Sequence, residues 1–283
     1  MRYLTHTPGP PLADFVAYFW ALRDAPAHSM ERIVPSGTLE LVVNLYEDAV
    51  PIYDPRSMAW RTYSGAVVSG AYQRFFVIDT REHASIVGVH FRPGGAAPFL
   101  GVPPGELAGR HVDLETLWGR LAIELREQLC AAATPPERFA VLDRALRSRL
   151  SGPRHRHPAV PFALDQLARS GVTVGEVAAS VQLSRRRLIE VFTAEVGMTP
   201  KRLSRVLRFQ RASAMARRDG APDWGRLALA CGYFDQSHLI HDVNDLTGTS
   251  PVQLVRTSEQ VKDFHLAVPE GVKFLQDPHR ACP

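Results

Sequence analysis

The segment Leu183–Pro200, with the sequence LSRRRLIEVFTAEVGMTP, contains a complete helix with its start and stop signals. Ser184 is a good N-cap, because its hydroxyl can accept a hydrogen bond from a backbone N–H of the first turn. Gly197 favours the left-handed conformation that ends many helices, and Thr199-Pro200 caps and opens the next one. We therefore expect a helix over 185–196. The side chains that it would bury are Leu188, Val191 and Phe192.

A shorter helix is predicted directly before this one. Thr173-Val174-Gly175-Glu176 is a capping box, in which the threonine and the glutamate each bond the other's backbone N–H. The helix that it starts has an apolar face with Val177, Ala178 and Val181. The turn Gln182-Leu183 joins the two helices. Two short helices around a tight turn, the second exposing polar side chains, form the helix-turn-helix pattern.

The same signals recur 51 residues further along the chain, which indicates an internal repeat. Asp223 and Asp235 are predicted N-caps of a second helix pair. Gly232 lies at its turn, and Gly248 ends its second helix. The matched positions are Ala179 with Ala230, Leu188 with Leu239, Gly197 with Gly248, Thr199-Pro200 with Ser250-Pro251, Leu203 with Leu254 and Arg205 with Arg256. The chain is therefore expected to contain two helix-turn-helix units in tandem.

A continuous helix from Pro200 to about Arg218 is predicted between the two units. At 1.5 Å per residue it spans roughly 28 Å, close to the ~34 Å between successive major grooves on one side of B-DNA. Its polar side carries Lys201, Arg202, Arg205, Arg208 and Arg211. This spacing favours double-stranded DNA over RNA as the partner.

Positive charge is concentrated in the same part of the chain. Residues 152–258 contain 15 Lys+Arg and 9 Asp+Glu, a net charge of +6, whereas the 283-residue chain as a whole has +4. Such segregation is expected when one segment faces a polyanion. On charge alone, a chance clustering in an arginine-rich protein stays open as the alternative.

The overall composition is that of an ordinary globular protein of about two domains, with 45% hydrophobic and 22% charged residues. Its three cysteines are far apart and form no zinc-binding or disulfide pattern. The N-terminus lacks the apolar core of a signal peptide, and no apolar run approaches ~20 residues. We therefore expect a cytoplasmic protein without a membrane span, a metal or a cofactor.

The chain is predicted to have an α+β fold with two domains. Residues 1–151 would form the first domain, a small antiparallel β-barrel or sandwich up to about residue 103 with a helical hairpin over 104–151. Residues 152–157 read as a linker and 158–258 as an all-α domain. The tail 259–283 lies outside the repeat. Within it, Val272–Gln276 is either a short strand that returns to the first domain or a docked arm.

The first domain is rich in aromatic residues, with 16 of the chain's 24 lying before residue 152. Such residues can line a ligand cavity, form an ordinary core, or lie on an exposed face that binds a protein. The candidate set for an effector pocket is Trp20, Tyr46, Trp60, Tyr63 and Phe91.

The two repeated signatures resemble the AraC/XylS family of bacterial transcription regulators over about 100 residues. The matching motifs are Leu183-Ser184-x-x-x-Leu188-x-x-x-Phe192 through Gly197-x-Thr199-Pro200, then Ala230-Cys231-Gly232-Tyr233-x-Asp235-x-Ser237-His238-Leu239 through Gly248-x-Ser250-Pro251. Pro35-Ser36-Gly37-x-x-Glu40-Leu41 and Phe91-Arg92-Pro93-Gly94-Gly95 are similar to an uncharacterised domain often found ahead of this DNA-binding domain. The resemblance implies a cupin-like domain for sensing or dimerisation.

The resemblance also implies which residues contact DNA. Base contacts are expected from Arg186, Ile189, Glu190, Gln236, Ser237, His238 and His241. Contacts to phosphates or neighbouring bases are expected from Ser184, Arg185, Arg187, Thr193, Arg202 and Arg205. Arginine is the best donor to guanine, glutamate accepts from cytosine, and glutamine pairs with adenine.

Several positions depart from the family pattern. The family usually has arginine at Glu190 and His241, a basic residue at Thr193 and Asn244, and an aromatic anchor at Val243. We therefore expect the second unit to bind more weakly than the first, or mostly to the DNA backbone.

Two other classes of function are possible alternatives to a DNA-binding regulator. An enzyme, or a DNA-repair methyl acceptor fused to the repeat, needs an activated nucleophile or a metal cluster. Cys130 on a leucine-rich helix is expected to be a core residue, and His83 with His90 is a weak metal signal, so we expect no enzyme. The alternative for the first domain is a protein-interaction module. RNA polymerase and a small-molecule or protein effector are candidate partners, and monomer or homodimer stays open.

Overall fold

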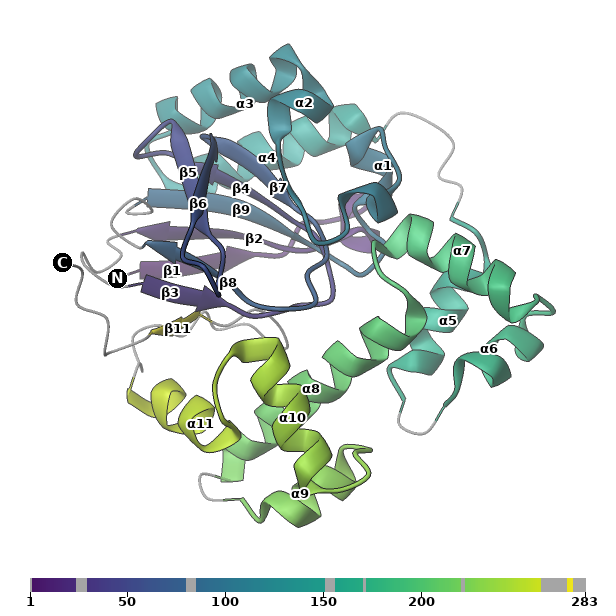
Figure 1. Cartoon of the computed structure of the whole chain (residues 1–283). Coiled ribbons are helices and arrows are strands. Elements are labelled where there is room, and N and C mark those ends of the chain that lie inside the picture. Colours follow the sequence, from purple (N-terminus) through teal and green to yellow (C-terminus); the bar gives the residue numbers. More distant parts are fainter. Residues whose placement is uncertain are drawn as a thin grey trace.

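The computed structural model describes residues 2–23, 30–79, 85–150, 156–169, 172–219, 222–260 and 274–276. Two antiparallel β-sheets with a layer of helices form the N-terminal half, and helices form the C-terminal half (Figure 1). The α+β prediction is therefore confirmed, and the two sheets face each other without closing into a barrel.

The first sheet has six strands in the order β1-β2-β9-β4-β7-β10. Their bounds are β1 Arg2–His6, β2 Val16–Arg23, β9 Ser85–Phe91, β4 Glu40–Asn44, β7 Ala66–Ser69 and β10 His111–Asp113. The long apolar strands β2 and β9 pair near its centre, where Trp20 lies opposite Gly88. A side chain on Gly88 would come within 2.5 Å of the Trp20 ring, so glycine leaves room for the indole.

β10 corrects the prediction of a purely helical segment after residue 103. It is three residues long and pairs with β7, with Val112 opposite Val68. Such a short strand has too few residues for alternation to show in the sequence, and only its pairing partner defines it.

The second sheet has five strands in the order β11-β3-β8-β5-β6. Their bounds are β11 Phe274–Gln276, β3 Met30–Ile33, β8 Phe76–Asp79, β5 Ala49–Tyr53 and β6 Trp60–Ser64. β11 belongs to the C-terminal tail and runs antiparallel to β3, with Leu275 opposite Arg32. The tail therefore returns to the first domain as a strand, one of the two alternatives left open by its sequence.

Helices cover the outer face of the first sheet (Figure 1). Their bounds are η1 Leu12–Asp14, α1 Ala97–Leu100, η3 Pro104–Leu107, α2 Leu114–Trp118, α3 Arg120–Ala131 and α4 Pro135–Arg149. α3 and α4 form the predicted hairpin and bury Leu125, Leu129 and Leu142. Cys130 is exposed, so the expectation of a core cysteine was wrong: it follows Leu129 in α3, about 100° around the helix from the buried face.

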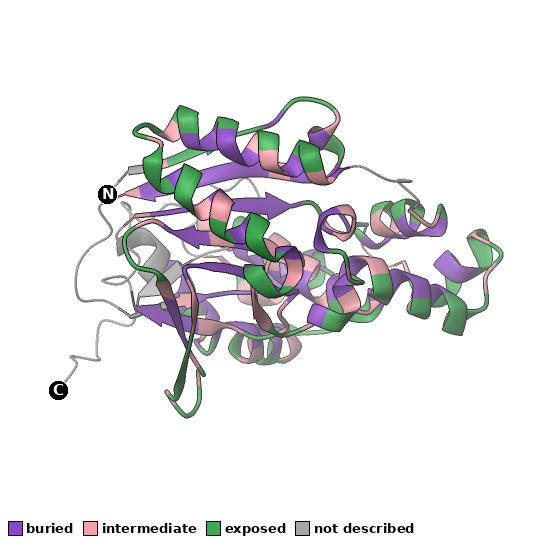
Figure 2. Ribbon diagram, turned by 90° about the horizontal axis from the view of Figure 1, so that it is seen from above, coloured by how far each residue is buried: buried purple, intermediate pink, exposed green. Residues whose placement is uncertain are grey.

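The C-terminal half consists of seven helices within the described residues. Their bounds are α5 Ala159–Leu167, α6 Val174–Ser180, α7 Arg185–Val196, α8 Pro200–Asp219, α9 Trp224–Ala230, α10 Gln236–Thr247 and α11 Pro251–Gln260. Of the predicted linker 152–157, only Arg156 and His157 lie within the described residues. The helices expose one face each, whereas the central strands are almost wholly buried (Figure 2).

Two hydrophobic cores divide this C-terminal half. The main core of the first sheet continues without a break into α5, α6 and α7, where it includes Phe192 and Val196. A second core joins the later part of α8 to α9, α10 and α11, around Phe209 and Leu239. Only Val34 represents the first domain among the buried residues of this second core.

Candidate nucleic-acid interface

The first helix pair, α6 with α7, is called unit one below. Thr173 and Glu176 form the predicted capping box at the start of α6, with the Thr173 backbone N–H donating to Glu176 Oε2 at 2.8 Å. Ser184 caps α7 by accepting from the Arg187 backbone N–H at 3.1 Å. Gly197 ends α7 in the left-handed region, at φ 86°. These local signals account for the start of both helices and for the end of α7.

The outer face of α7 carries a pair of opposite charges. The Arg186 side chain is 90% exposed, and its Nε donates to Glu190 Oε1 at 2.9 Å. Arg187 adds a second contact to the same carboxylate at 3.5 Å. The hydrogen bond from Arg186 holds the pKa of Glu190 below its usual value. Because the pair is exposed, solvent screens it, and a ligand with its own donors and acceptors can replace it.

The other residues predicted on unit one differ in how they are placed. Ser184, Arg185 and Arg187 are exposed, and Ile189 is half-buried at the edge of this face. Thr193 instead lies against η3, where a side chain on Gly105 would come within 2.8 Å of the Thr193 carbonyl oxygen. The Thr193 hydroxyl is buried without a hydrogen-bond partner in the described structure. The first domain thus covers the position predicted for a phosphate contact.

The second helix pair, α9 with α10, is called unit two. Asp223 caps α9 and Asp235 caps α10 through side-chain hydrogen bonds to backbone N–H groups. α10 buries Leu239, Val243 and Leu246 and ends at Gly248, which has φ 69°. Val243 is buried although it lacks the expected aromatic ring.

The turn of unit two is one residue longer than that of unit one. The Leu183 N–H donates to the Ala178 carbonyl in unit one, and the Tyr233 N–H donates to the Ala228 carbonyl in unit two. Ala178 therefore corresponds to Ala228, which corrects the pairing of Ala179 with Ala230 that a constant spacing suggested. The N-cap Ser184 follows directly in unit one, but Phe234 intervenes in unit two.

Phe234 was missed by the sequence analysis and is the most exposed large apolar residue within the described structure, at 85%. It lies directly before the N-cap of α10, beside the positions predicted to contact bases. A constant repeat spacing hid it. An apolar side chain at the start of a recognition helix can contact the methyl group of thymine.

Gln236, Ser237 and His241 of α10 are exposed, whereas His238 is partly enclosed. The Nδ1 of His238 accepts from the Phe234 backbone N–H at 3.4 Å, and its Nε2 lies 4.0 Å from Asp242. The imidazole also meets the Tyr233 ring edge-on.

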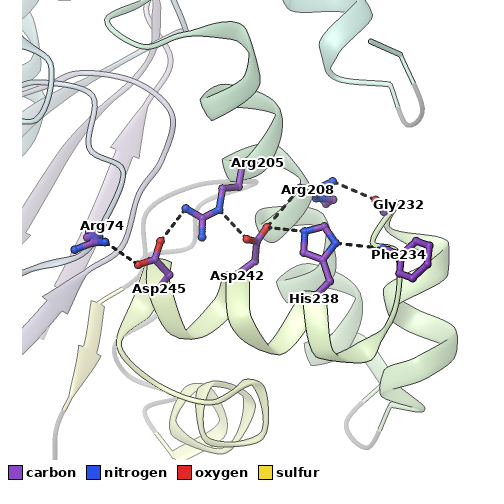
Figure 3. Close-up of polar contacts among 8 residues, drawn as sticks. All are labelled: Arg74, Arg205, Arg208, Gly232, Phe234, His238, Asp242 and Asp245. Carbon is purple, nitrogen blue, oxygen red and sulfur yellow. Dashed lines mark hydrogen bonds and ion pairs between the residues drawn. The ribbon is translucent and has the colours of Figure 1, made fainter. Parts of the chain in front are cut away.

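Asp242 connects α10 to the linking helix α8 (Figure 3). Its side chain is only 6% exposed and accepts from Arg205 Nε at 2.8 Å, with Arg208 at 3.5 Å. Arg205 also contacts Asp245 at 2.8 Å, and Asp245 in turn meets Arg74 of the first domain at 3.2 Å. Arg205, predicted to contact phosphate, is therefore engaged between two carboxylates, whereas Arg202 is exposed.

Both units rest the C-terminal ends of their second helices on the first domain. Gly197 lies where a side chain would come within 3.2 Å of Leu39. Gly248 lies directly under the Phe75 ring, where a side chain would come within 2.4 Å. The Phe75 backbone N–H also donates to the Leu246 carbonyl at 3.0 Å. The outward faces of α7 and α10 remain exposed in this arrangement.

The five aromatic residues predicted to line one pocket lie in different places. Phe91 is fully buried in the main core, and Tyr46 is 63% exposed. Trp20 lies between the two sheets beside a space of about 40 Å³. Only Trp60 and Tyr63 line a common large cavity. The five residues therefore do not form a common pocket: Trp20 and Phe91 belong to the first sheet, Trp60 and Tyr63 to the second, and Tyr46 lies in the loop between β4 and β5.

The candidate metal residues also separate. His90 Nδ1 lies 2.5 Å from Glu40 Oε1, and its ring stacks on Tyr18. His83 lies outside the described residues. No cluster of three or more His, Cys, Asp or Glu side chains suited to a metal occurs in the described ranges. None of the helices described there is long and apolar enough to cross a membrane.

Comparison with protein families gives two matches. Residues 177–257 match a family described as a helix-turn-helix domain, which covers α7 to α10 and most of α11. Residues 4–113 match a family described as a domain of unknown function (DUF6597). No curated protein matches the chain.

Several solved structures are similar to parts or most of the chain. ToxT from Vibrio cholerae strain SCE256, solved with a bound unsaturated fatty acid, is 10% identical, with 90% of this chain and 97% of that chain covered and a TM-score of 0.44. The C-terminal domain of AraT, a response regulator from Geobacillus stearothermophilus, is 23% identical over 40% of this chain and 99% of that chain, with a TM-score of 0.34. A DNA-binding transcriptional dual regulator from Escherichia coli K-12 is 23% identical over 39% and 96%, with a TM-score of 0.31.

Residues 177–257 are therefore a helix-turn-helix domain, and the protein is a DNA-binding transcription regulator. With both repeated signatures in place, this domain is of the AraC type, and it follows an N-terminal domain of unknown function.

Proposed function

We propose that α7 and α10 are recognition helices that enter adjacent major grooves on one side of a DNA duplex. The observation that carries this proposal is that each helix buries one face and exposes the opposite one, where its predicted contact residues lie. α8 has 20 residues and spans roughly 30 Å, which suits the ~34 Å repeat of the duplex. The proposed base contacts are Arg186, Ile189, Glu190, Gln236, Ser237, His238 and His241.

In unit one, Arg186 and Glu190 exchange their mutual ion pair for contacts to bases. The guanidinium donates to guanine O6 and N7, and the carboxylate accepts from cytosine N4. These two side chains lie one turn apart on α7. Unit one is therefore expected to select G·C base pairs.

In unit two, Phe234 supplements the polar contacts. Its exposed ring lies two residues before Gln236. The side-chain amide of Gln236 can form two hydrogen bonds with adenine. Unit two is therefore expected to favour A·T pairs, through the thymine methyl group and adenine. Contacts to the DNA backbone are assigned to the exposed residues Ser184, Arg185, Arg187 and Arg202. Thr193 and Arg205 can contact DNA only if their present contacts within the protein break.

Selection from random DNA duplexes, followed by footprinting, tests this proposal. Two protected major-groove segments about one helical turn apart are expected, the G·C-rich one assigned to unit one by an Arg186→Ala variant. The affinity should also fall steeply with salt, because phosphate contacts release counterions. A single protected half-site, or equal binding to all duplexes, would contradict the tandem arrangement.

For the N-terminal domain we propose a regulatory role, because it supports both units at their C-terminal ends. It responds either to a small effector or to a protein partner. A thermal-shift screen with small molecules favours the effector if any compound raises the melting temperature, because a ligand that binds the native state stabilises it. RNA polymerase remains the proposed partner of the DNA-bound regulator, as a monomer or a homodimer.

A further inference from the structure

A cavity of about 630 Å³ opens on the first domain beside the second sheet. Four arginines line it, Arg56, Arg61, Arg74 and Arg110, against a single carboxylate, that of Asp54. The Asp54 carboxylate is already engaged in its own turn, where it accepts from the backbone N–H groups of Arg56 and Ser57. Within the described ranges, Arg56, Arg61 and Arg110 have no carboxylate oxygen within 4.0 Å. The arginines that line the cavity therefore outnumber its carboxylate, even though Arg74 is paired with Asp245.

Aromatic rings form much of the remaining wall. Tyr72 stacks on His111 with ring centroids 4.5 Å apart, and its hydroxyl is buried without a hydrogen-bond partner in the described structure. Ser69 Oγ lies 3.0 Å from Nδ1 of His111, and burial lowers the pKa of His111 to about 3, so its ring is neutral at pH 7. Tyr63 lies beneath Arg61 at 5.1 Å, and Trp60 is 67% exposed.

This combination of size, charge and aromatic wall matches one kind of ligand. Small-molecule sites usually measure about 300–1,000 Å³ and combine apolar walls with a few polar groups. Guanidinium groups bind carboxylates and phosphates through paired charge-assisted hydrogen bonds. Aromatic faces favour a flat apolar body.

The same wall also supports unit two. Arg74 lines the cavity and pairs with Asp245 of α10, and the neighbouring Phe75 contacts Leu246 and Gly248. Asp245 shares Arg205 with Asp242, and Asp242 reaches His238 (Figure 3). A chain of ion pairs thus runs from the cavity to Asp242, which lies 4.0 Å from the imidazole of His238, a residue proposed to contact a base.

We propose that this cavity binds a small aromatic anion. Its charged group pairs with Arg74 in place of Asp245, and this removes the ion pair that attaches α10 to the first domain. The binding step stands on the cavity alone, whereas its effect on DNA rests on the proposed function. Asp245 keeps Arg205 when Arg74 leaves, so unit two stays folded and loses one of its attachments to the first domain.

Calorimetric titration of the full chain without DNA tests the binding step, with indole-3-acetate as the anionic probe and indole-3-acetamide as its uncharged match. The acid should bind at least about 10-fold more tightly than the amide, since tenfold corresponds to one modest charge-assisted hydrogen bond. Arg61→Ala/Arg110→Ala should weaken the acid about 10-fold or more. Arg120→Ala/Arg169→Ala removes two exposed arginines elsewhere and is the matched control.

Three outcomes of the titration would overturn the site: no binding of the acid up to about 10 mM, equal binding of acid and amide, or equal losses in the two double variants. A loss of DNA affinity in Arg61→Ala/Arg110→Ala without ligand would assign these arginines to the DNA backbone instead, and would also overturn it. Because the titration contains no DNA, its failure is distinct from a failure of DNA binding.

The coupling is tested by measuring DNA affinity with and without saturating probe. In the wild type the probe should change the DNA dissociation constant by about 5-fold or more, the lower range of allosteric coupling. Arg74→Ala should have the DNA affinity of the probe-bound wild type and show no further response at saturation. Arg74→Lys, which keeps the charge, should retain a response. An unchanged response in Arg74→Ala would overturn the assignment of Arg74.

Discussion

Unit one and unit two share one architecture but are held by the rest of the molecule in different ways. α7 belongs to the same hydrophobic core as the first sheet, through Phe192 and Val196. α10 has a core of its own and meets the first domain at its end, through Phe75 and Arg74. Two copies of one motif can therefore be attached to the same domain in different ways. Unit two, which is attached at one end of α10, is the copy that we expect to respond to a ligand of the first domain.

The polar faces of α7 and α10 also differ in how their charged side chains are used. In unit one the charged pair Arg186–Glu190 is exposed and turned outward. In unit two the main carboxylate, Asp242, is buried and binds Arg205 and Arg208 of α8. The charged side chains of α7 are therefore accessible to a binding partner, whereas the carboxylate of Asp242 attaches α10 to α8.

The largest expected effect separates the two cores. Phe192→Ala should lower the free energy of unfolding by about 3–5 kcal/mol, because a large ring leaves a fully buried site. It should lower the protection of both α7 and the sheet strands in hydrogen exchange, since they share a core. Leu239→Ala, a truncation in the second core, should cost about 2–5 kcal/mol and affect the later part of α8 and α9 to α11 alone. Loss of protection in the sheet with Leu239→Ala would break the distinction.

The next effect concerns the two carboxylates. Asp242→Asn should destabilise the protein by up to about 3 kcal/mol, because it removes a buried charge that compensates two arginines. Glu190→Gln should leave stability nearly unchanged, since its pair is exposed. Denaturant titration of both variants measures the difference. Equal losses would show that burial does not set the roles of the two residues.

A third prediction compares the DNA contacts. Arg186→Ala should weaken binding to the preferred duplex roughly 5- to 150-fold and relax the preference at one base pair. His241→Ala should weaken binding less and leave the sequence preference intact, as expected for a contact that sets register. Competition assays against single-base variants of the selected site distinguish these effects. A uniform loss for all sequences with Arg186→Ala would remove its base-reading role.

The smallest effect concerns the additional residue in the turn of unit two. Phe234→Ala should change stability by less than about 0.5 kcal/mol, because the ring is exposed. It should weaken DNA binding several-fold and do so only for sites with thymine opposite unit two. Leu229→Ala removes another exposed apolar side chain, on α9, and is the control. Equal DNA affinity in the two variants would leave Phe234 without a role in recognition.

The sequence by itself determined the local plan of the C-terminal half. Caps such as Ser184 and Asp235 and stops such as Gly197 act within one turn of their own helix, so their positions predict the helix bounds directly. The periodic apolar residues likewise predicted which face each helix buries. The α+β organisation followed from the change between strand-like and helix-like patterns.

Only the tertiary structure decided what lies against these helices. Whether Thr193 is covered, whether Arg205 is free, and which aromatic residues share a cavity all depend on segments far apart in the chain. β10 and β11 are defined by their partners β7 and β3 rather than by their own residues. The physical reason is the range of the interactions. Capping and periodicity act over a few residues, whereas burial and ion pairing depend on segments that are distant in sequence and adjacent only in the folded structure.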